Sequence, residues 1–183
     1  MLAQNADRLG FALHVVDTLI CDELPGKPGI SSSAIRDAIA RGDVAAAEAM
    51  PARPHSITGD VGGGAGRGAS LGIPTANLND IPQLIPAEAV YAAAAELADG
   101  RLYLAAVNIG PQPTFDSDVR RIEAHLLDYE GDLRGTRLRL HFFERIRRQI
   151  KFATVDELVR QLHDDIATTA GCAARLKSLR PAH

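Results

Sequence analysis

A glycine-rich stretch that runs into a short polar segment holds the residues best suited to chemistry. Residues 62–80 read GGGAGRGASLGIPTANLND. Glycines allow backbone N–H groups to approach phosphate oxygens closely, because no Cβ blocks the approach. The candidate phosphate-binding residues are Gly64, Gly66, Arg67 and Gly68, with Arg67 as the local positive charge. The alternative is an ordinary surface hairpin tip, since glycine is frequent in turns.

Thr75 and Asn77 follow this stretch and are two positions apart. In an extended segment, residues at i and i+2 lie on the same side. A hydroxyl and an amide oxygen are hard ligands that suit Mg²⁺, which usually also keeps waters and substrate phosphates. The pair therefore predicts a magnesium site. The alternative is the start of a strand at which both side chains cap a turn.

Glu123 is the candidate base. It lies in RRIEAHLLD (120–128), where apolar and polar residues alternate as in a strand with one polar face. A carboxylate on that face can deprotonate a substrate hydroxyl as it attacks a phosphoryl group. The alternative is an outward carboxylate paired with Arg120 or Arg121, which is common on strands.

The elements that must position these residues are mainly strands. Residues 55–61 alternate, and residues 90–110 contain two apolar runs that meet at Asp99-Gly100, a strong hairpin signal. Residues 120–147 give two more strands with turn residues between them. Several short strands joined by hairpin turns favour a small antiparallel barrel.

A helix is expected to close the barrel. Thr154 and Glu157 form a capping box at its start. The apolar residues that follow recur at helical spacing and define one face of the helix. That face consists of Leu158, Val159, Leu162 and Ile166.

The first fifty-odd residues differ in character. Residues 2–9 predict a short helix that ends at Gly10, and residues 11–20 predict a strand. Serine caps predict a helix over 31–42, and Asp43 caps another that Pro51 ends. We expect residues 1–53 to be the remnant of an α/β unit and residues 54–183 to form the barrel domain.

Composition excludes several classes of protein. The net charge is −3, the pI is about 6.1 and aromatic residues make up 4%, so a nucleic-acid partner is not expected. No apolar run is long enough to span a membrane, and the N-terminus lacks the features of a secretory signal. The two cysteines, Cys21 and Cys172, form no disulfide framework, which predicts a cytoplasmic location. The oligomeric state is not predicted.

Together these segments resemble riboflavin kinase, specifically the kinase module of the bacterial bifunctional riboflavin kinase/FAD synthetase. The matching pieces run in order over residues 54–170. They are GRGASLGIPTANL (66–78), VYA (90–92), VNIGPQPTF (107–115), EAHLLDYEGDLRG (123–135) and IRRQIKF (146–152) with the helix after it. The resemblance implies a six-stranded antiparallel β-barrel with a C-terminal helix and ATP-dependent phosphorylation of the riboflavin 5′-hydroxyl, giving FMN.

The resemblance also implies roles for individual residues. The glycine-rich residues Gly64–Gly68, here called the glycine flap, would cover the nucleotide phosphates. Asn108 would contact ATP. Thr75 and Asn77 would hold Mg²⁺, and Glu123 would be the base. Arg147 and Phe152 match positions near the flavin.

The N-terminal piece and five departures qualify this picture. Residues 30–36 look like the closing motif of the adenylyltransferase module, but no His-x-Gly-His motif is present, so we expect no FAD synthesis by this chain. The positions that depart from the family pattern are Gly63, Ala65, Ala89, Arg134 and Gln149, the last of which replaces an acid. Two alternatives stay open, namely a fragment of a bifunctional enzyme and a flavin- or nucleotide-binding module without turnover.

Overall fold

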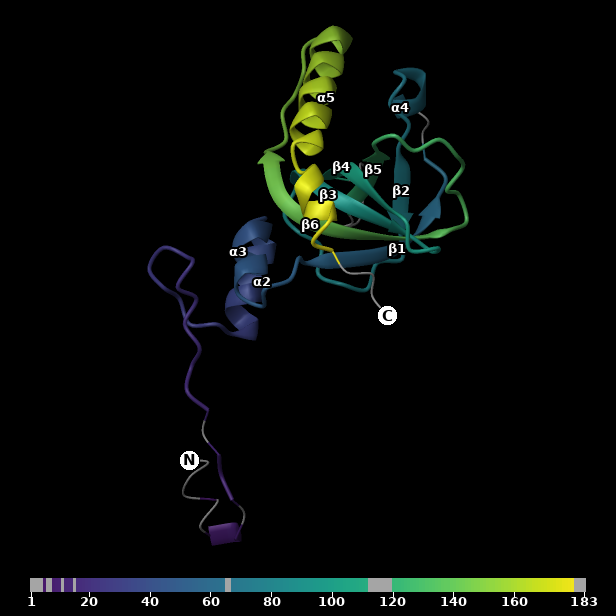
Figure 1. Cartoon of the computed structure of the whole chain (residues 1–183). Helices are drawn as coiled ribbons and strands as arrows, with labels where there is room; N and C mark the ends of the chain where they lie inside the picture. Colours follow the sequence, from purple (N-terminus) through teal and green to yellow (C-terminus); the bar gives the residue numbers. More distant parts are fainter. Residues whose placement is uncertain are drawn as a thin grey trace.

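The computed structural model describes residues 5, 8–10, 12–14, 16–64, 67–111 and 120–179, with only the backbone of Arg67. Six antiparallel strands close into a barrel in the order β1-β2-β5-β4-β3-β6 (Figure 1). Their bounds are β1 Ser56–Gly62, β2 Ala76–Asn79, β3 Ala89–Leu97, β4 Leu102–Pro111, β5 Arg120–Leu126 and β6 Arg137–Arg147. The predicted six-stranded barrel with a C-terminal helix is therefore confirmed.

The alanine-rich strand β3 is buried on both of its faces. One face belongs to the barrel interior, where Tyr91 packs against Phe142 of β6. The other face carries Ala92 and Ala94, which pack in an outer cluster with Phe143. Small side chains on this outer face let the C-terminal helices approach the sheet closely. The run VYAAAA is thus explained by two layers of packing on a single strand.

The β3–β4 hairpin turns where the sequence predicts it. Gly100 has a φ of +83°, a left-handed conformation that glycine adopts without strain. The strands pair in register from Ala89 opposite Ile109 to Glu96 opposite Leu102. The turn therefore sets the register that later places Asn108 in the site.

Helix α5, Val155–Ala170, begins at the predicted residue, and the short helix α6, Ala173–Leu176, follows it. The Thr154 hydroxyl accepts a hydrogen bond from the Glu157 N–H at 3.2 Å. The Glu157 carboxylate accepts from the N–H of Ala153 at 3.0 Å, one residue earlier than a capping box requires. In Figure 1, α5 and the short helix α4, Arg67–Ser70, project from the same side of the barrel.

Two short helices precede the barrel, α2 (Ser32–Ala40) and α3 (Val44–Ala49). As predicted, Ser31 and Asp43 cap them, each accepting a backbone N–H three residues ahead. These helices are not separate from the barrel. Val44 joins the barrel's apolar cluster, and contacts between α3 and β6 hold the pair against the sheet.

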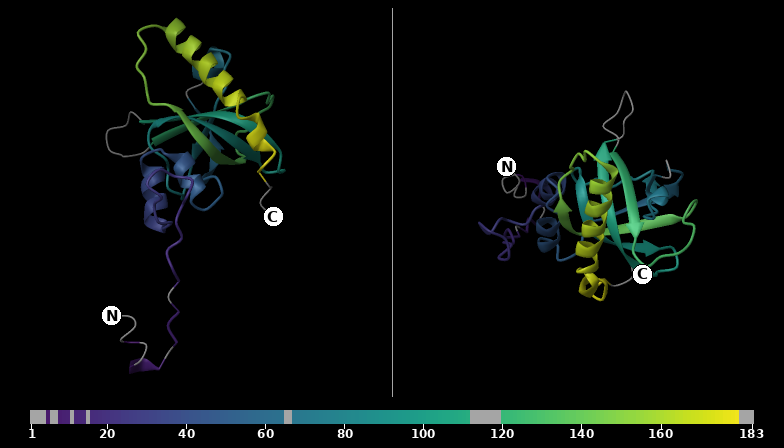
Figure 2. Two further views of the ribbon diagram at one scale, coloured as in Figure 1. Left: turned by 60° about the vertical axis from the view of Figure 1, so that its left-hand side comes forward. Right: turned by 90° about the horizontal axis from the view of Figure 1, so that it is seen from above.

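The predicted strand at residues 11–20 is wrong for the described part of that segment. Residues 12–14 and 16–19 form no strand, and Ile20 makes only an isolated bridge to Gly29. The segment runs away from the barrel (Figures 1 and 2), so its backbone has no neighbouring strand with which to pair. The described apolar residues of the segment are exposed, with Val16 at 85%. The expected α/β remnant therefore holds helices without a strand in the described residues.

The predicted helix over 2–9 lies largely outside the described residues. Asn5, Arg8 and Leu9 have helical backbone, and Gly10 follows with a φ of +71°. None of the helices described is long and apolar enough to cross a membrane.

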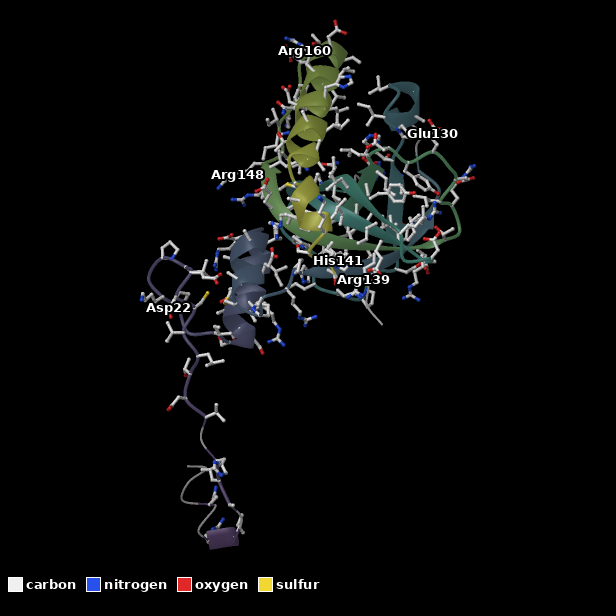
Figure 3. All side chains as sticks on the ribbon, viewed as in Figure 1. Asp22, Glu130, Arg139, His141, Arg148 and Arg160 are labelled. Atoms are coloured by element: carbon white, nitrogen blue, oxygen red, sulfur yellow. The ribbon has the colours of Figure 1, made fainter. Side chains whose placement is uncertain are left out.

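A buried histidine makes the stability of the barrel depend on pH. His141 of β6 contacts the Glu96 carboxylate of β3 at 2.8 Å, near the base of the barrel in Figure 3. Burial lowers the pKa of His141 below its ordinary value of 6.5, although the hydrogen bond to Glu96 acts in the opposite direction. Between these two pKa values the unfolded chain binds a proton that the folded chain does not.

We therefore expect the free energy of unfolding to fall as the pH is lowered through 6.5 towards the folded-state pKa. Urea denaturation at pH 7.5 and pH 5.5 measures this. The difference between the two pH values should shrink in His141→Gln and stay unchanged in the control His163→Gln, because His163 is exposed on α5. Equal differences in the parent and His141→Gln would contradict the assignment.

Candidate active site

Three of the predicted site residues are register neighbours on adjacent strands. Asn77 of β2 lies opposite Glu123 of β5, and Glu123 lies opposite Asn108 of β4. Each is only partly buried and is flanked in its strand by buried residues that point into the core. The three side chains therefore stand in one row on the outer surface of the barrel.

The same row continues to Arg147, a residue predicted to lie near the flavin. Val90 of β3 is the register partner of both Asn108 and Arg147 of β6. Side chains from this row line a pocket of about 800 Å³ that also reaches the glycine flap and helix α5. In strand order, Glu123 and Asn108 lie between the predicted metal ligands and the predicted flavin-binding residues.

The two described glycines of the flap, Gly64 and Gly68, lie against the predicted metal ligands. A Cβ on Gly64 would collide with the amide of Asn77, and one on Gly68 would collide with the Ile73 carbonyl and meet the Thr75 side chain. Gly68 therefore needs glycine, because a backbone carbonyl cannot move aside, whereas a Cβ at Gly64 would displace the Asn77 side chain. Gly66 and the side chain of Arg67 lie outside the described residues.

His125 anchors the segment that carries Thr75. Its Nδ1 lies 2.8 Å from the carbonyl oxygen of Pro74. A carbonyl only accepts hydrogen bonds, so Nδ1 carries the proton. This bond ties β5 to the residue before Thr75, and it gives His125 of the polar face a structural role beside Glu123.

Two adjacent glycines give a matched test of the flap. Gly64→Ala places a methyl group where the Asn77 amide now lies, whereas Gly63→Ala meets nothing within 4 Å. Asn77 is a flexible side chain, so we expect it to rotate away while the fold survives. In an assay of the riboflavin phosphorylation that the resemblance implies, we expect Gly64→Ala to raise the KM for MgATP about tenfold and Gly63→Ala to leave it within about twofold. Equal KM values in both variants would contradict a flap packed on Asn77.

Glu123 has the surroundings that a base needs. Among the side chains that the structure describes, the nearest cation is Arg121, whose Nη1 lies 3.8 Å from Glu123 Oε1, and both side chains are about a quarter exposed. The ion pair considered from the sequence thus exists, but at a separation too long for a hydrogen bond. Among the described residues, no hydrogen bond to the Glu123 carboxylate is found. Its oxygens are therefore available to a hydroxyl bound in the pocket.

Arg147 is held by a buried carboxylate on α5. Its guanidinium donates to Asp165 at 2.9 Å from Nε and 2.7 Å from Nη2, and Asp165 is only 2% exposed. The same guanidinium lies 5.7 Å from the centre of the Phe152 ring. Both predicted flavin-side residues therefore line the pocket together, with Arg147 fixed in place by Asp165.

Sequence reasoning missed Asp165 and Gln161, which donates to Asp165 at 3.0 Å. A signal was present, because Asp165 follows Leu158 by seven positions and so falls on the apolar face of α5. A charged residue on such a face requires a buried partner. The apolar face itself is only half-buried, and Leu158, Leu162 and Ile166 line the pocket instead of the core.

Comparison with known proteins supports one family. The sequence model of the riboflavin kinase family matches residues 51–172. A bifunctional riboflavin kinase/FMN adenylyltransferase from Haemophilus influenzae is 35% identical over 168 residues, which are 92% of this chain and 53% of that protein. Its Escherichia coli K12 counterpart is 38% identical over 76% of this chain and 44% of its own length.

A solved structure agrees with the fold. The crystal structure of a macrolide-efflux protein from Streptococcus pneumoniae superposes with a TM-score of 0.73 and 35% identity, over 78% of this chain and 47% of that one. The chain spans about half the length of the curated relatives it matches. Because the family match covers most of this chain, including every strand of the barrel, the chain belongs to the riboflavin kinase family.

Proposed function

We propose that this chain phosphorylates the 5′-hydroxyl of riboflavin with ATP and produces FMN. The row Asn77–Glu123–Asn108 carries the proposal, because it places a free carboxylate between a glycine flap and an apolar wall. A phosphate donor fits the flap side, and an aromatic ring system fits the wall formed by α5 and Phe152. Membership of the riboflavin kinase family supports the same reaction.

In this mechanism Glu123 first accepts a hydrogen bond from the riboflavin hydroxyl. As the hydroxyl oxygen attacks the terminal phosphorus of ATP, Glu123 takes the proton and the bond to ADP breaks. Backbone N–H groups of the flap donate to the phosphate oxygens that gain charge. Arg67 would add a positive charge there, as its place in the sequence suggests.

Thr75 and Asn77 are the residues that would hold Mg²⁺. Their hydroxyl and amide oxygens are hard donors, and the described residues offer no group of three His, Cys, Asp or Glu for a caged metal. This donor set suits an ion that arrives with the nucleotide and retains phosphate and water ligands. Bound there, Mg²⁺ would neutralise the charge of the phosphates.

On the flavin side, Arg147 and Phe152 would contact the isoalloxazine ring and its polar edge. Arg147 retains N–H groups beyond those given to Asp165, because a guanidinium has five. Leu158, Leu162 and Ile166 would cover one face of the ring. The fixed geometry of Arg147 reduces the entropy lost on binding.

The proposed reaction can be tested with the purified chain, riboflavin, ATP and Mg²⁺, using chromatography to separate the flavins. We expect FMN and no FAD. Absence of FMN together with quenching of riboflavin fluorescence would overturn the proposal in favour of a binding module.

We also propose a reducing, cytoplasmic compartment, because Cys21 and Cys172 are both free thiols.

A further inference from the structure

Gln149 makes two hydrogen bonds that cross from the end of β6 to β4. Its Nε2 donates to Asn108 Oδ1 at 2.8 Å and to the Ile109 carbonyl oxygen at 2.7 Å. The contact joins residues 41 positions apart, which lie close together because β4 and β6 both pair with β3. Gln149, like Asn108, lines the pocket. It is also one of the positions at which the sequence departs from the family pattern.

The chemistry of these two bonds fixes the orientation of both carboxamides. The Ile109 carbonyl can only accept, so the Gln149 atom that faces it must be the nitrogen. The same nitrogen faces Asn108, so the Asn108 atom that it meets must be the oxygen. The assignment therefore follows from a backbone carbonyl and does not depend on telling oxygen from nitrogen by position alone.

The orientation of Asn108 decides what it offers to a ligand. With Oδ1 occupied by Gln149, its free groups are the two N–H donors of Nδ2, and no acceptor for them is found among the described residues. Asn108 is the register neighbour of Glu123, which only accepts when ionised. The site thus pairs a donor and an acceptor on neighbouring strands.

We propose that Gln149 is a positioning residue that holds Asn108 as a hydrogen-bond donor towards the pocket, where it binds a phosphate oxygen of the nucleotide. A phosphate oxygen carries no proton and accepts from N–H groups. A carboxylate at position 149 would reverse the orientation of the Asn108 carboxamide. It cannot donate a hydrogen bond, so it would draw Nδ2 of Asn108 towards itself. The identity of the ligand rests on the proposed kinase function, whereas the orientation of Asn108 rests on the contacts alone.

Proton exchange of the side-chain amides, measured by NMR on the ¹⁵N-labelled full chain, tests the orientation directly. The Asn108 signal can be assigned by its loss in Asn108→Asp. In the parent, the Gln149 amide protons should exchange with water about tenfold more slowly than those of Asn108, because only the former have protein acceptors. In Gln149→Glu, the Asn108 protons should become the slow ones. Slow Asn108 protons in the parent, or no change in Gln149→Glu, would overturn the proposal.

Calorimetric titration with Mg²⁺ and a non-hydrolysable ATP analogue tests the consequence. Gln149→Leu should weaken binding about tenfold relative to the parent, because the Asn108 carboxamide loses the partner that fixes its orientation. Gln83→Leu is the matched control, because it removes the same carboxamide outside the pocket. Equal loss in both variants would assign the effect to the loss of any carboxamide and overturn the role of Gln149 in binding. If the parent binds no nucleotide, the proposed function fails, and the exchange measurement still decides the orientation.

Discussion

Replacing Glu123 with glutamine is expected to lower kcat for FMN formation by about 10²–10⁴-fold, the usual contribution of a general base. Glutamine keeps the shape and hydrogen-bonding length of glutamate but cannot accept the hydroxyl proton. The KM values for riboflavin and ATP should change little, because the role proposed for Glu123 is to take the proton in the transition state. Steady-state assays with chromatographic detection of FMN provide the measurement.

The fold should be unaffected by this change. The Arg121–Glu123 pair is partly exposed and separated by 3.8 Å, so its loss costs about 0–1 kcal/mol. Glu130→Gln is the matched control, since Glu130 is an exposed carboxylate in the loop after β5 and outside the pocket lining (Figure 3). A kcat for Glu123→Gln within threefold of the control would refute the base assignment, provided that the thermal midpoints agree.

Of the substitutions proposed for this protein, Asp165→Ala is expected to lower the free energy of unfolding most. Asp165→Ala leaves the Arg147 guanidinium without its buried partner and leaves the Gln161 amide without its acceptor. Breaking a buried ion pair from one side costs about 3–5 kcal/mol, because the remaining charge stays desolvated. Urea denaturation followed by circular dichroism measures this difference in the free energy of unfolding.

Asp164→Ala is the control for helix propensity and charge, since Asp164 is the exposed neighbour on the same helix. We expect it to change stability by less than about 0.5 kcal/mol. Asp165→Ala should also weaken riboflavin binding, because Arg147 loses its fixed orientation beside Phe152. A stability loss equal to that of Asp164→Ala would show that the Arg147–Asp165 pair makes no net contribution to the free energy of unfolding.

The sequence was sufficient for the parts of the fold that are local. Alternation in residues 120–126 predicted the strand that presents Glu123, and Asp99-Gly100 predicted the hairpin. Thr154 predicted the start of α5. Each of these features depends on backbone preferences and periodicity within about ten residues, which a single sequence contains.

The errors and omissions involve partners that are distant in the chain. The apolar run at 11–20 has the composition of a strand, but strand formation requires a neighbour that the described structure does not supply. The contact of Gln149 with Asn108 depends on the pairing of β4 and β6 with the same strand, β3, and the contact of Asp165 with Arg147 depends on helix packing. Periodicity also cannot distinguish an apolar helix face that packs on the core from one that lines a pocket. The sequence therefore predicted α5 and its apolar face, but not that this face lines the pocket.

The single row of site residues limits where the sequence can gain or lose residues. Side chains alternate between the core and the outer surface along each strand, so deleting one residue within β4 or β5 would turn Asn108 or Glu123 inward. A closed barrel leaves no free edge at which a shifted strand could settle without disturbing two neighbours. Insertions and deletions compatible with activity are therefore confined to the connections between strands, and evolutionary variation in the site must proceed by substitution.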